Sequence, residues 1–381
     1  MPFTGKATYD GGSALPELVD DVSDLVGLIT PFDTPLLDAI GSPRYAAKST
    51  RHEWFEDKLN PGYSRIDNAA GYNASATSWI VDQGSAFRVG DLIKPEGSDE
   101  VLQIPAVAAN TLTVARGYGG SVAAAVSDNQ LVRVIGHAAL EGEDAPLPAF
   151  QNRQRRENFT QIFTESVMIS GSLDAVGLHA VEREFDYQVI QRLRELLRSL
   201  EQSVINGFKS ATSPEGSASA RRTMGGLLQF ISGAEAVVHD AAAAALDEAT
   251  LNSALRACWE KGGRPGAIVC GGFQKRRISG FIQSARRYEA ESTVLKSVVD
   301  VYESDFGAQR VVLSRWVPAD KVFLLDLDKI QVLPLQGRSF FVKPLAESGD
   351  FRKAQIIGEY TLEVLNAGDG GHGVITNLAT A

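Results

Sequence analysis

Two groups of histidine and glutamate residues have a spacing that could serve metal chemistry. His52-Glu53-x-x-Glu56 resembles a metal-binding helix motif, and His179 and Glu182 stand three positions apart, which places them on one face of a helix. Zinc, however, needs three or four converging donors, and the five histidines are widely scattered. We therefore predict a packing role for the first group, a solvated or subunit-facing position for the second, and no metal site.

Anion chemistry is the second possibility that the residue types raise. Gly271-Gly272 follows the apolar run AIVC and precedes a basic stretch, 275–277, so a helix N-terminus there could hold an anion. The other glycines of a dinucleotide loop are missing. The basic stretch, extended by Arg286 and Arg287, could mark a nucleic-acid contact, a salt-bridged subunit edge or a solvated helix face, of which the solvated face is the default.

Motifs of known catalytic classes are missing from the sequence. It contains no G-x-x-x-x-G-K-[ST], H-E-x-x-H, G-x-S-x-G or C-x-x-C pattern. We therefore predict that the protein is not an enzyme and that it has no catalytic, cofactor-binding or metal-binding residues.

Cysteine usage and the N-terminus indicate a reduced compartment. Cys258 and Cys270 are too few for a disulfide framework and are spaced wrongly for a paired zinc motif. The start, MPFTGKATYDGG, lacks the basic and apolar regions of a secretory signal, and no run approaches the roughly 18 apolar residues of a membrane span. The glycosylation triplets at Asn73 and Asn158 are therefore interpreted as chance matches.

Length and charge restrict the class of protein. A chain of 381 residues exceeds the roughly 250–300 at which one hydrophobic core stops growing, so two or three compact regions are expected. Hydrophobic residues make up 44% and charged residues 22%, which is typical of a folded protein. The net charge of −10 disfavours tight nucleic-acid binding, because each neutralised phosphate needs a Lys or Arg.

The N-terminal third contains three successive sequence patterns. Residues 1 to about 20 are rich in Gly, Pro, Thr and Asp and indicate an extended arm that needs a partner. STRHEWFEDKL then predicts a strand with His52, Trp54 and Glu56 on one face. From about Thr77 to His137, short alternating segments separated by turn pairs predict a small all-β module, a compact barrel or sandwich inserted into the longer chain.

The clearest helical periodicity covers residues 172–208. Apolar residues recur there every three to five positions: Leu173, Val176, Val181, Phe185, Val189, Leu193, Leu196, Leu200, Val204 and Phe208. One helix of this length would span roughly 55 Å. Beyond it, GGLLQFI, a helix that begins near Asp247, the buried strand GAIVCGG and a further helix lead into mostly strands, which together indicate an α+β fold.

Three segments resemble one protein family. They are GLITPFDTPLLDAIG leading to HEWFEDKL, the stretch from RVGDLI to VARGYGG, and GEYTLEVLN to HGVI. In this order they resemble the SU-ten type of major head (capsid) proteins of tailed bacteriophages, which have the Hong Kong 97 capsid fold.

The resemblance implies a division of the chain into the parts of that fold. These are an N-terminal arm (1–22), the start of a peripheral domain (23–48), an extended loop (49–171) carrying the β module (about 77–137), the peripheral domain (172–223) with a spine helix (172–208), an axial domain (224–328) and return strands of the peripheral domain (329–381).

The resemblance also implies a function. The protein is expected to self-assemble as pentamers and hexamers into the icosahedral shell of the virion, after synthesis in the host cytoplasm. Partners would be separate scaffolding, decoration and portal proteins, with weak, non-specific contact to packaged double-stranded DNA and none to a membrane.

Three other functions stay open at this point. They are a nanocompartment shell of the same fold, a soluble α+β enzyme with a site near Gly271-Gly272, and a sugar- or receptor-binding role of the β module through Trp79 and Tyr118.

Overall fold

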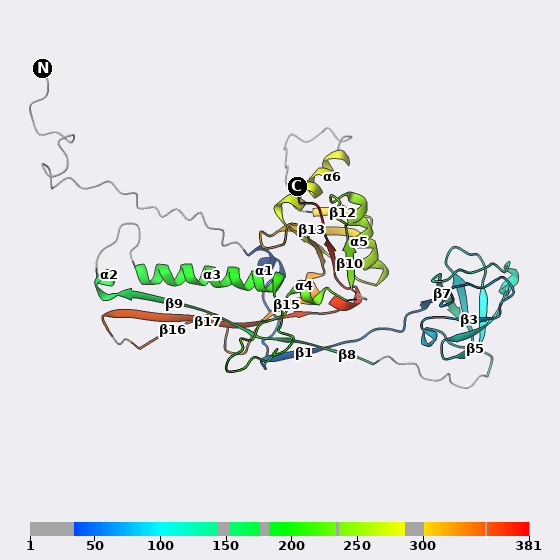
Figure 1. Ribbon diagram of the computed structural model, residues 1–381, viewed down its shortest axis with the longest axis horizontal. Coiled ribbons are helices and arrows are strands. Elements are labelled where there is room, and N and C mark those ends of the chain that lie inside the picture. Colours follow the sequence, from blue (N-terminus) through cyan, green and yellow to red (C-terminus); the bar gives the residue numbers. More distant parts are fainter. Residues whose placement is uncertain are drawn as a thin grey trace, which may run out of the picture. The chain divides into compact units, whose positions relative to one another are not determined.

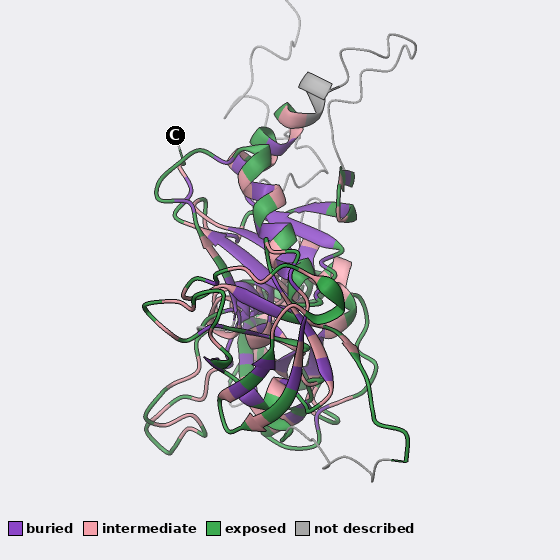
Figure 2. Cartoon of the chain, turned by 90° about the vertical axis from the view of Figure 1, so that its right-hand side faces the viewer, coloured by how far each residue is buried: buried purple, intermediate pink, exposed green. Residues whose placement is uncertain are grey.

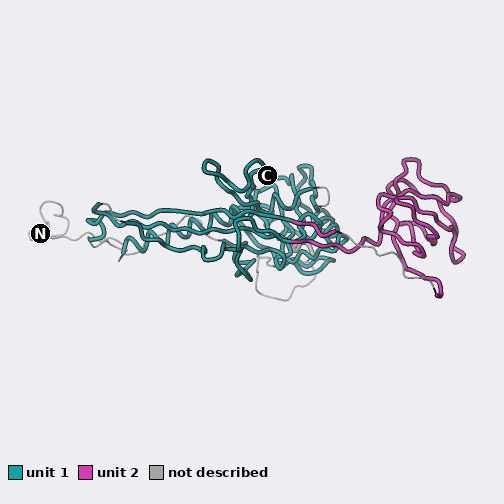
Figure 3. The backbone as a smooth tube through the Cα atoms, turned by 90° about the horizontal axis from the view of Figure 1, so that it is seen from below, with its two compact units in different colours: residues 1–54, 156–381 teal, residues 55–155 magenta. Residues whose placement is uncertain are grey.

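The computed structural model describes residues 34–142, 152–175, 183–233, 236–285, 301–346 and 349–380. The predicted arm (1–22) lies outside these residues, as do His179, Glu182, Arg286 and Arg287. The chain divides into two compact units, residues 1–54 with 156–381 and residues 55–155 (Figure 3).

Strands β1 to β9 follow one another after helix α1, and the later part of the chain contains the other helices and strands β10 to β18 (Figure 1). The helices are α1 (Pro35–Ile40), α2 (Gly171–Ala175), α3 (Glu184–Asn206), α4 (Leu227–Phe230), α5 (Glu248–Glu260) and α6 (Gly272–Ala285). The strands are β1 (Arg51–Glu56), β2 (Tyr63–Arg65), β3 (Ser78–Ile80), β4 (Asp91–Pro95), β5 (Leu102–Ala108), β6 (Thr111–Ala115), β7 (Leu131–His137), β8 (Gln154–Phe159), β9 (Gln161–Ser170), β10 (Val237–Asp240), β11 (Ala267–Cys270), β12 (Val301–Ser304), β13 (Gly307–Leu313), β14 (Val322–Leu325), β15 (Ile330–Pro334), β16 (Phe341–Pro344), β17 (Phe351–Val364) and β18 (Gly373–Thr376).

The longest strand of the first unit, β17, organises a four-stranded antiparallel sheet. It pairs with β9 on one side and with β15 and β16 on the other. Helix α3 runs alongside β9 and β17 (Figure 1), and its residues Leu196, Leu200 and Val204 share one buried cluster with Ile356 and Leu362 of β17. Apolar residues at helical spacing thus pack on the alternate residues of a strand.

Helix α3 is shorter than the periodicity predicted. Its N-cap residue, Arg183, has the extended angles φ −138° and ψ 99°, so a single helix over residues 172–208 was the wrong prediction. The 23 residues of α3 correspond to roughly 35 Å at 1.5 Å per residue. Apolar spacing in a sequence indicates which side of a helix is buried, but it does not show that a residue such as Arg183 is extended.

A mixed six-stranded sheet in the order β10-β18-β14-β11-β13-β12 forms the second layer of this unit. Both of its faces are covered. Ile268 of β11 packs with α5 and α6, whereas Val269 packs in the cluster that contains α3. Because both faces are covered, every residue of β11 is buried, as its apolar run predicted. Figure 2 shows that buried residues are concentrated in the strands.

Two local predictions about this sheet had different outcomes. Helix α5 begins near Asp247 as expected, and Asp247 caps it, because its carboxylate accepts a hydrogen bond of 2.7 Å from the Thr250 N–H. Strand β18, however, lies between β10 and β14 in the six-stranded sheet, so the segment 329–381 does not return wholly to the sheet of β17.

The described residues of the second unit, 55–142 and 152–155, contain strands and two short 3-10 helices but no α-helix, in agreement with the predicted β module. Its strands form one antiparallel sheet in the order β2-β7-β4-β5-β6-β3 around a core that includes Trp79, Ile93 and Leu112. The unit begins before Thr77, because β2 pairs with β7. Gly84 is required by a close approach: a Cβ there would lie 1.8 Å from the Ala109 carbonyl oxygen.

Candidate functional site: the carboxylate face of β17

One face of β17 is polar although it is buried. Tyr360, Leu362 and Val364 point toward α3, so the alternate residues Glu359, Thr361 and Glu363 point the other way. We call these three residues the carboxylate face; each is less than 5% exposed. A buried carboxylate is costly unless charged or hydrogen-bonding partners compensate it, so the partners define what this face does.

Glu359 binds groups from three separate chain segments. Its Oε1 accepts hydrogen bonds from Thr160 Oγ1 at 2.6 Å and from Arg222 Nη2 at 2.5 Å. Arg338 Nε lies 2.8 Å from Oε2 as an ion pair whose N–H is not aligned for a hydrogen bond. Arg222 also donates to the Thr160 carbonyl oxygen, so residues 160, 222 and 338 are tied to one side chain.

Glu363 binds the segment that leads into β1. The Tyr45 hydroxyl donates to Glu363 Oε2 at 2.6 Å, and His52 Nε2 lies 2.5 Å from the same oxygen. Burial by itself would raise the pKa of Glu363, but the hydrogen bonds from His52 and Tyr45 outweigh it, so this pKa lies below its usual value of 4.5. Burial and the neighbouring carboxylate raise the pKa of Tyr45.

The carboxylate face therefore holds both ends of the excursion that contains the second unit. Strands β1 and β8, which lead into and out of that unit, pair with each other. Next to them the Thr160 N–H donates to the Thr50 carbonyl oxygen at 2.9 Å. The buried amide of Asn158 bonds both the Leu362 carbonyl oxygen and the backbone of Gly225, so it cannot be a glycosylation site in this fold.

A third buried carboxylate fixes the start of the described chain. Glu201 of α3 accepts hydrogen bonds from the N–H groups of Leu36 and Leu37 at 3.4 Å and from Ser314 Oγ at 2.8 Å. The Glu201 carboxylate thus meets the N-terminus of α1. Burial outweighs these donors and raises the pKa of Glu201 above its usual 4.5.

None of these contacts forms a reaction centre among the residues that the structure describes. No group of three His, Cys, Asp or Glu side chains there could hold a metal ion, and no helix there could span a membrane. His52 and Glu53 point to opposite faces of β1, where Trp54 and Glu56 are buried and Phe55 is exposed, which is the predicted alternation.

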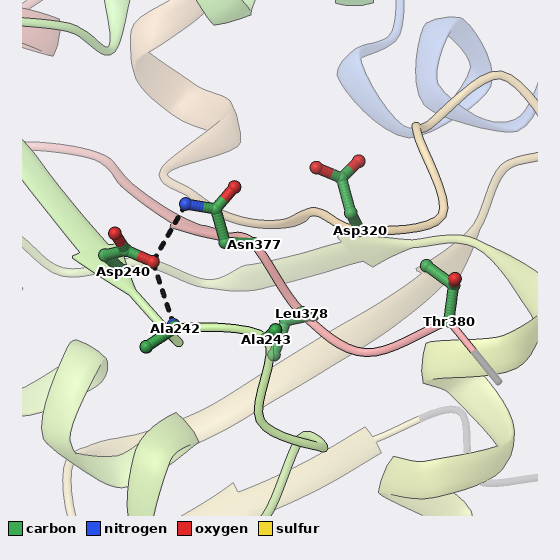
Figure 4. A pocket seen from close by; sticks show the side chains of 7 residues that line it. All are labelled: Asp240, Ala242, Ala243, Asp320, Asn377, Leu378 and Thr380. Atoms are coloured by element: carbon green, nitrogen blue, oxygen red, sulfur yellow. Dashed lines mark hydrogen bonds between the residues drawn. The ribbon is translucent and has the colours of Figure 1, made fainter.

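An open pocket lies away from the carboxylate face, at the end of β10 and β18 (Figure 4). It is lined by Asp240, Ala242, Ala243, Asp320, Asn377, Leu378 and Thr380. The Asp240 carboxylate accepts hydrogen bonds from the Ala242 N–H and Asn377 Nδ2, both at 2.9 Å, and these bonds lower its pKa. Asp240 therefore fixes a turn, and the lining contains no histidine or thiol that could act with it.

The other residues weighed for chemistry have structural surroundings. Trp79 is fully buried, so it cannot bind a sugar, while Tyr118 is exposed. Burial raises the pKa of the Cys258 and Cys270 thiols to about 12, which keeps them protonated. Lys275 reaches the Val311 carbonyl oxygen on the neighbouring strand.

Sequence reasoning missed the carboxylate face and Glu201. The available signal was two glutamates four positions apart in the strand segment GEYTLEVLN, since residues i and i+4 of a strand share a face. Their partners Tyr45, Arg222 and Arg338 have no sequence signal.

Comparison with known proteins gives the family. The family model of the SU10 major capsid protein matches residues 3–379, and no curated protein matches the chain. Among solved structures, the Cyanophage A-1(L) capsid asymmetric unit is similar with a TM-score of 0.53 at 12% identity, covering 96% of this chain and 98% of that chain. The capsid of a native GTA particle (TM-score 0.52, 9% identity, 98% and 99% covered) and Gordonia phage Cozz (0.51, 10%, 100% and 98%) are similar too.

At these identities the structural likeness establishes the fold, and the fold is the one that the sequence resemblance implied. The family model covers nearly the whole chain, including both units and the strand that carries Glu359 and Glu363. The chain belongs to the SU10 major capsid protein family and has the Hong Kong 97 capsid fold.

Proposed function

We propose that this protein is the repeating subunit of a tailed-phage head, assembling through pentamers and hexamers into an icosahedral shell that encloses double-stranded DNA. The observation that carries the proposal is the family match over residues 3–379. The protein acts by binding copies of itself and catalyses no reaction. Its place is the virion shell, after synthesis in the host cytoplasm, with separate scaffolding, decoration and portal proteins as partners.

The carboxylate face supports this proposal mechanically. A shell subunit whose chain leaves the first unit to form the second unit needs contacts that keep the core of the first unit folded. Glu359 and Glu363 bind side chains from both ends of that excursion, at His52 and at Thr160. Charge-assisted hydrogen bonds in a water-poor setting are stronger than exposed ones, so they suit an anchor that bears load between neighbouring subunits.

The acidic composition supports enclosure of DNA without tight binding. A net charge of −10 per copy repels the phosphate backbone, so the genome can move during packaging without adhering to the wall. The proposal favours a phage head over a nanocompartment because the matching family is a phage capsid family.

Electron microscopy with light scattering of the purified full-length protein tests the proposal. Closed hollow shells, or rings of five and six subunits, are expected. A small species of constant mass at every concentration, with and without a co-expressed scaffolding protein, would refute it.

The predicted arm gives a second test. Deleting residues 1–20 removes the part of the sequence with the fewest features of an independent core. The truncated chain should keep its circular dichroism spectrum and thermal unfolding but assemble poorly. Normal shells from the truncated chain would contradict the role of the arm.

A further inference from the structure

The second unit presents an apolar loop that its own core does not use. Residues 117–127, GYGGSVAAAVS, carry no charge. Within them Val122 is 84% exposed and Tyr118 42% exposed, although both are residues that folding normally covers. We call residues 117–125 the GYGGS loop.

The backbone of the GYGGS loop is held in one conformation. Gly117, Gly119 and Gly120 have φ values of 65°, 69° and 84°, a region that side-chain-bearing residues adopt with strain. The Ser121 hydroxyl oxygen accepts a hydrogen bond from the Val101 N–H, and its one proton lies within reach of the carbonyl oxygens of Tyr118 at 2.9 Å and Val101 at 3.2 Å. A loop with these constraints loses little conformational entropy when it binds.

A buried ion pair beneath the loop sets its position. Glu100, which is 1% exposed, accepts hydrogen bonds from Arg116 Nε at 2.7 Å and Nη2 at 2.8 Å and from the N–H groups of Gly117 and Ala124. Arg116 also donates to the Ala124 carbonyl oxygen and lies 5.0 Å from the centre of the Trp79 ring. Both ends of the loop are thus bonded to one buried carboxylate, while its tip faces solvent.

We propose that the GYGGS loop is a contact surface for a second copy of this chain, with Val122 and Tyr118 as the anchors that an apolar patch of that copy covers. The inference rests on the proposed shell function and names one of its contacts. Tyrosine is enriched among the residues that contribute most to interface affinity, and apolar side chains are common in the buried centre of interfaces.

Charge favours a second copy as the occupant. Each copy carries a net charge of −10, so copies repel one another, and contacts between them gain most where neither surface adds charge. The loop has this property over all nine of its residues. It lacks the Lys and Arg side chains that contact with nucleic acid requires.

The variants Val122→Asp and Val89→Asp test the proposal in the full-length protein. Val89 is a matched control, because it is a 52% exposed valine of the same unit outside the loop, and both changes add one negative charge. We expect V122D to lower the yield of shells about ten-fold or more at a fixed protein concentration, with unchanged thermal unfolding, while V89D assembles like the wild type.

Photo-crosslinking gives a readout that does not depend on yield. Cys258 and Cys270 are buried, so a benzophenone maleimide will label V122C or V89C selectively. In shells assembled from the labelled variants, the label at position 122 should crosslink two copies of the chain, and the label at position 89 should give far fewer crosslinks.

The outcomes separate the two proposals. If the wild type and V89D form shells and V122D forms them equally well without crosslinks from position 122, the loop proposal is wrong and the shell function stands. Normal V122D shells that instead lose binding to a glycan array or to lipid vesicles would also overturn it, by assigning the loop to another partner. If the wild type forms no shells at all, the proposed function itself fails.

Discussion

At the scale of single residues, the pKa values of the buried glutamates Glu363 and Glu201 are shifted in opposite directions. Glu363 has donors strong enough to keep its pKa below the usual value, whereas Glu201 has donors that do not offset its burial, so its pKa is raised. Each should therefore give the stability of the protein its own dependence on pH.

Glu363→Gln should lower the free energy of unfolding by about 2–4 kcal/mol at pH 7, because it removes the ionised acceptor of His52 and Tyr45. A lowered pKa in the folded state stabilises above the unfolded-state pKa, and this stabilisation is lost as the pH falls through the folded-state pKa. The difference between wild type and variant should therefore shrink in acid. Urea unfolding of the monomeric chain at pH 7 and pH 4 measures it; a difference that grows toward pH 4 would contradict the assignment.

Glu201→Gln should behave in the opposite way. A raised pKa in the folded state stabilises fully below the unfolded-state pKa, and this contribution is lost as the pH rises through the folded-state pKa. The unfolding free energies of variant and wild type should thus differ by about 1 kcal/mol or less at pH 7, and wild type should become more stable relative to the variant as the pH falls to 4. The same urea series serves as the measurement, and an equal difference at both pH values would refute the raised pKa.

At the scale of elements, the packing of α3 on β17 positions the carboxylate face. The apolar residues of β17 face α3, and this fixes the opposite direction of its glutamates, since side chains of a strand alternate. A change in the packing of α3 should therefore act on stability without touching any charged contact.

Leu200→Ala in α3 should lower the free energy of unfolding by about 2–5 kcal/mol, because Leu200 lies in the main buried cluster and its removal leaves a cavity. Gln202→Ala on the exposed side of the same helix is the control and should stay within about 0.5 kcal/mol of wild type. Equal effects of the two changes in urea unfolding would show that α3 does not pack as described.

At the scale of the whole molecule, the two units have separate hydrophobic cores. The core around Trp79 belongs to residues 55–155, and the cores around α3 and α5 belong to the rest of the chain. Separate cores favour separate unfolding transitions.

Trp79→Ala should lower the midpoint of one calorimetric transition of the monomeric chain and leave the other in place, because a fully buried aromatic side chain contributes about 3–5 kcal/mol to its own core only. Phe163→Ala in the first unit should shift the other transition. Equal shifts of every transition in both variants would indicate one cooperative unit.

Elements whose patterns are local were predictable without the structure. Alternation in HEWFEDKL, the apolar run AIVC and the helical pattern that begins near Asp247 predicted β1, β11 and α5, because these patterns depend on neighbours within one element. The break at Arg183 and the early start of the second unit escaped prediction, because an extended residue within a periodic run and a partner strand many residues away leave no local trace.

The role of the β17 glutamates, in contrast, depends on contacts between distant parts of the chain. Tyr45 and Glu363 are 318 positions apart, and Thr160 and Glu359 are 199 apart, so no spacing rule could connect them. The physical reason is that a buried carboxylate is defined by the donors that surround it. Those donors were brought together by the packing of α3, β9 and β15 on β17.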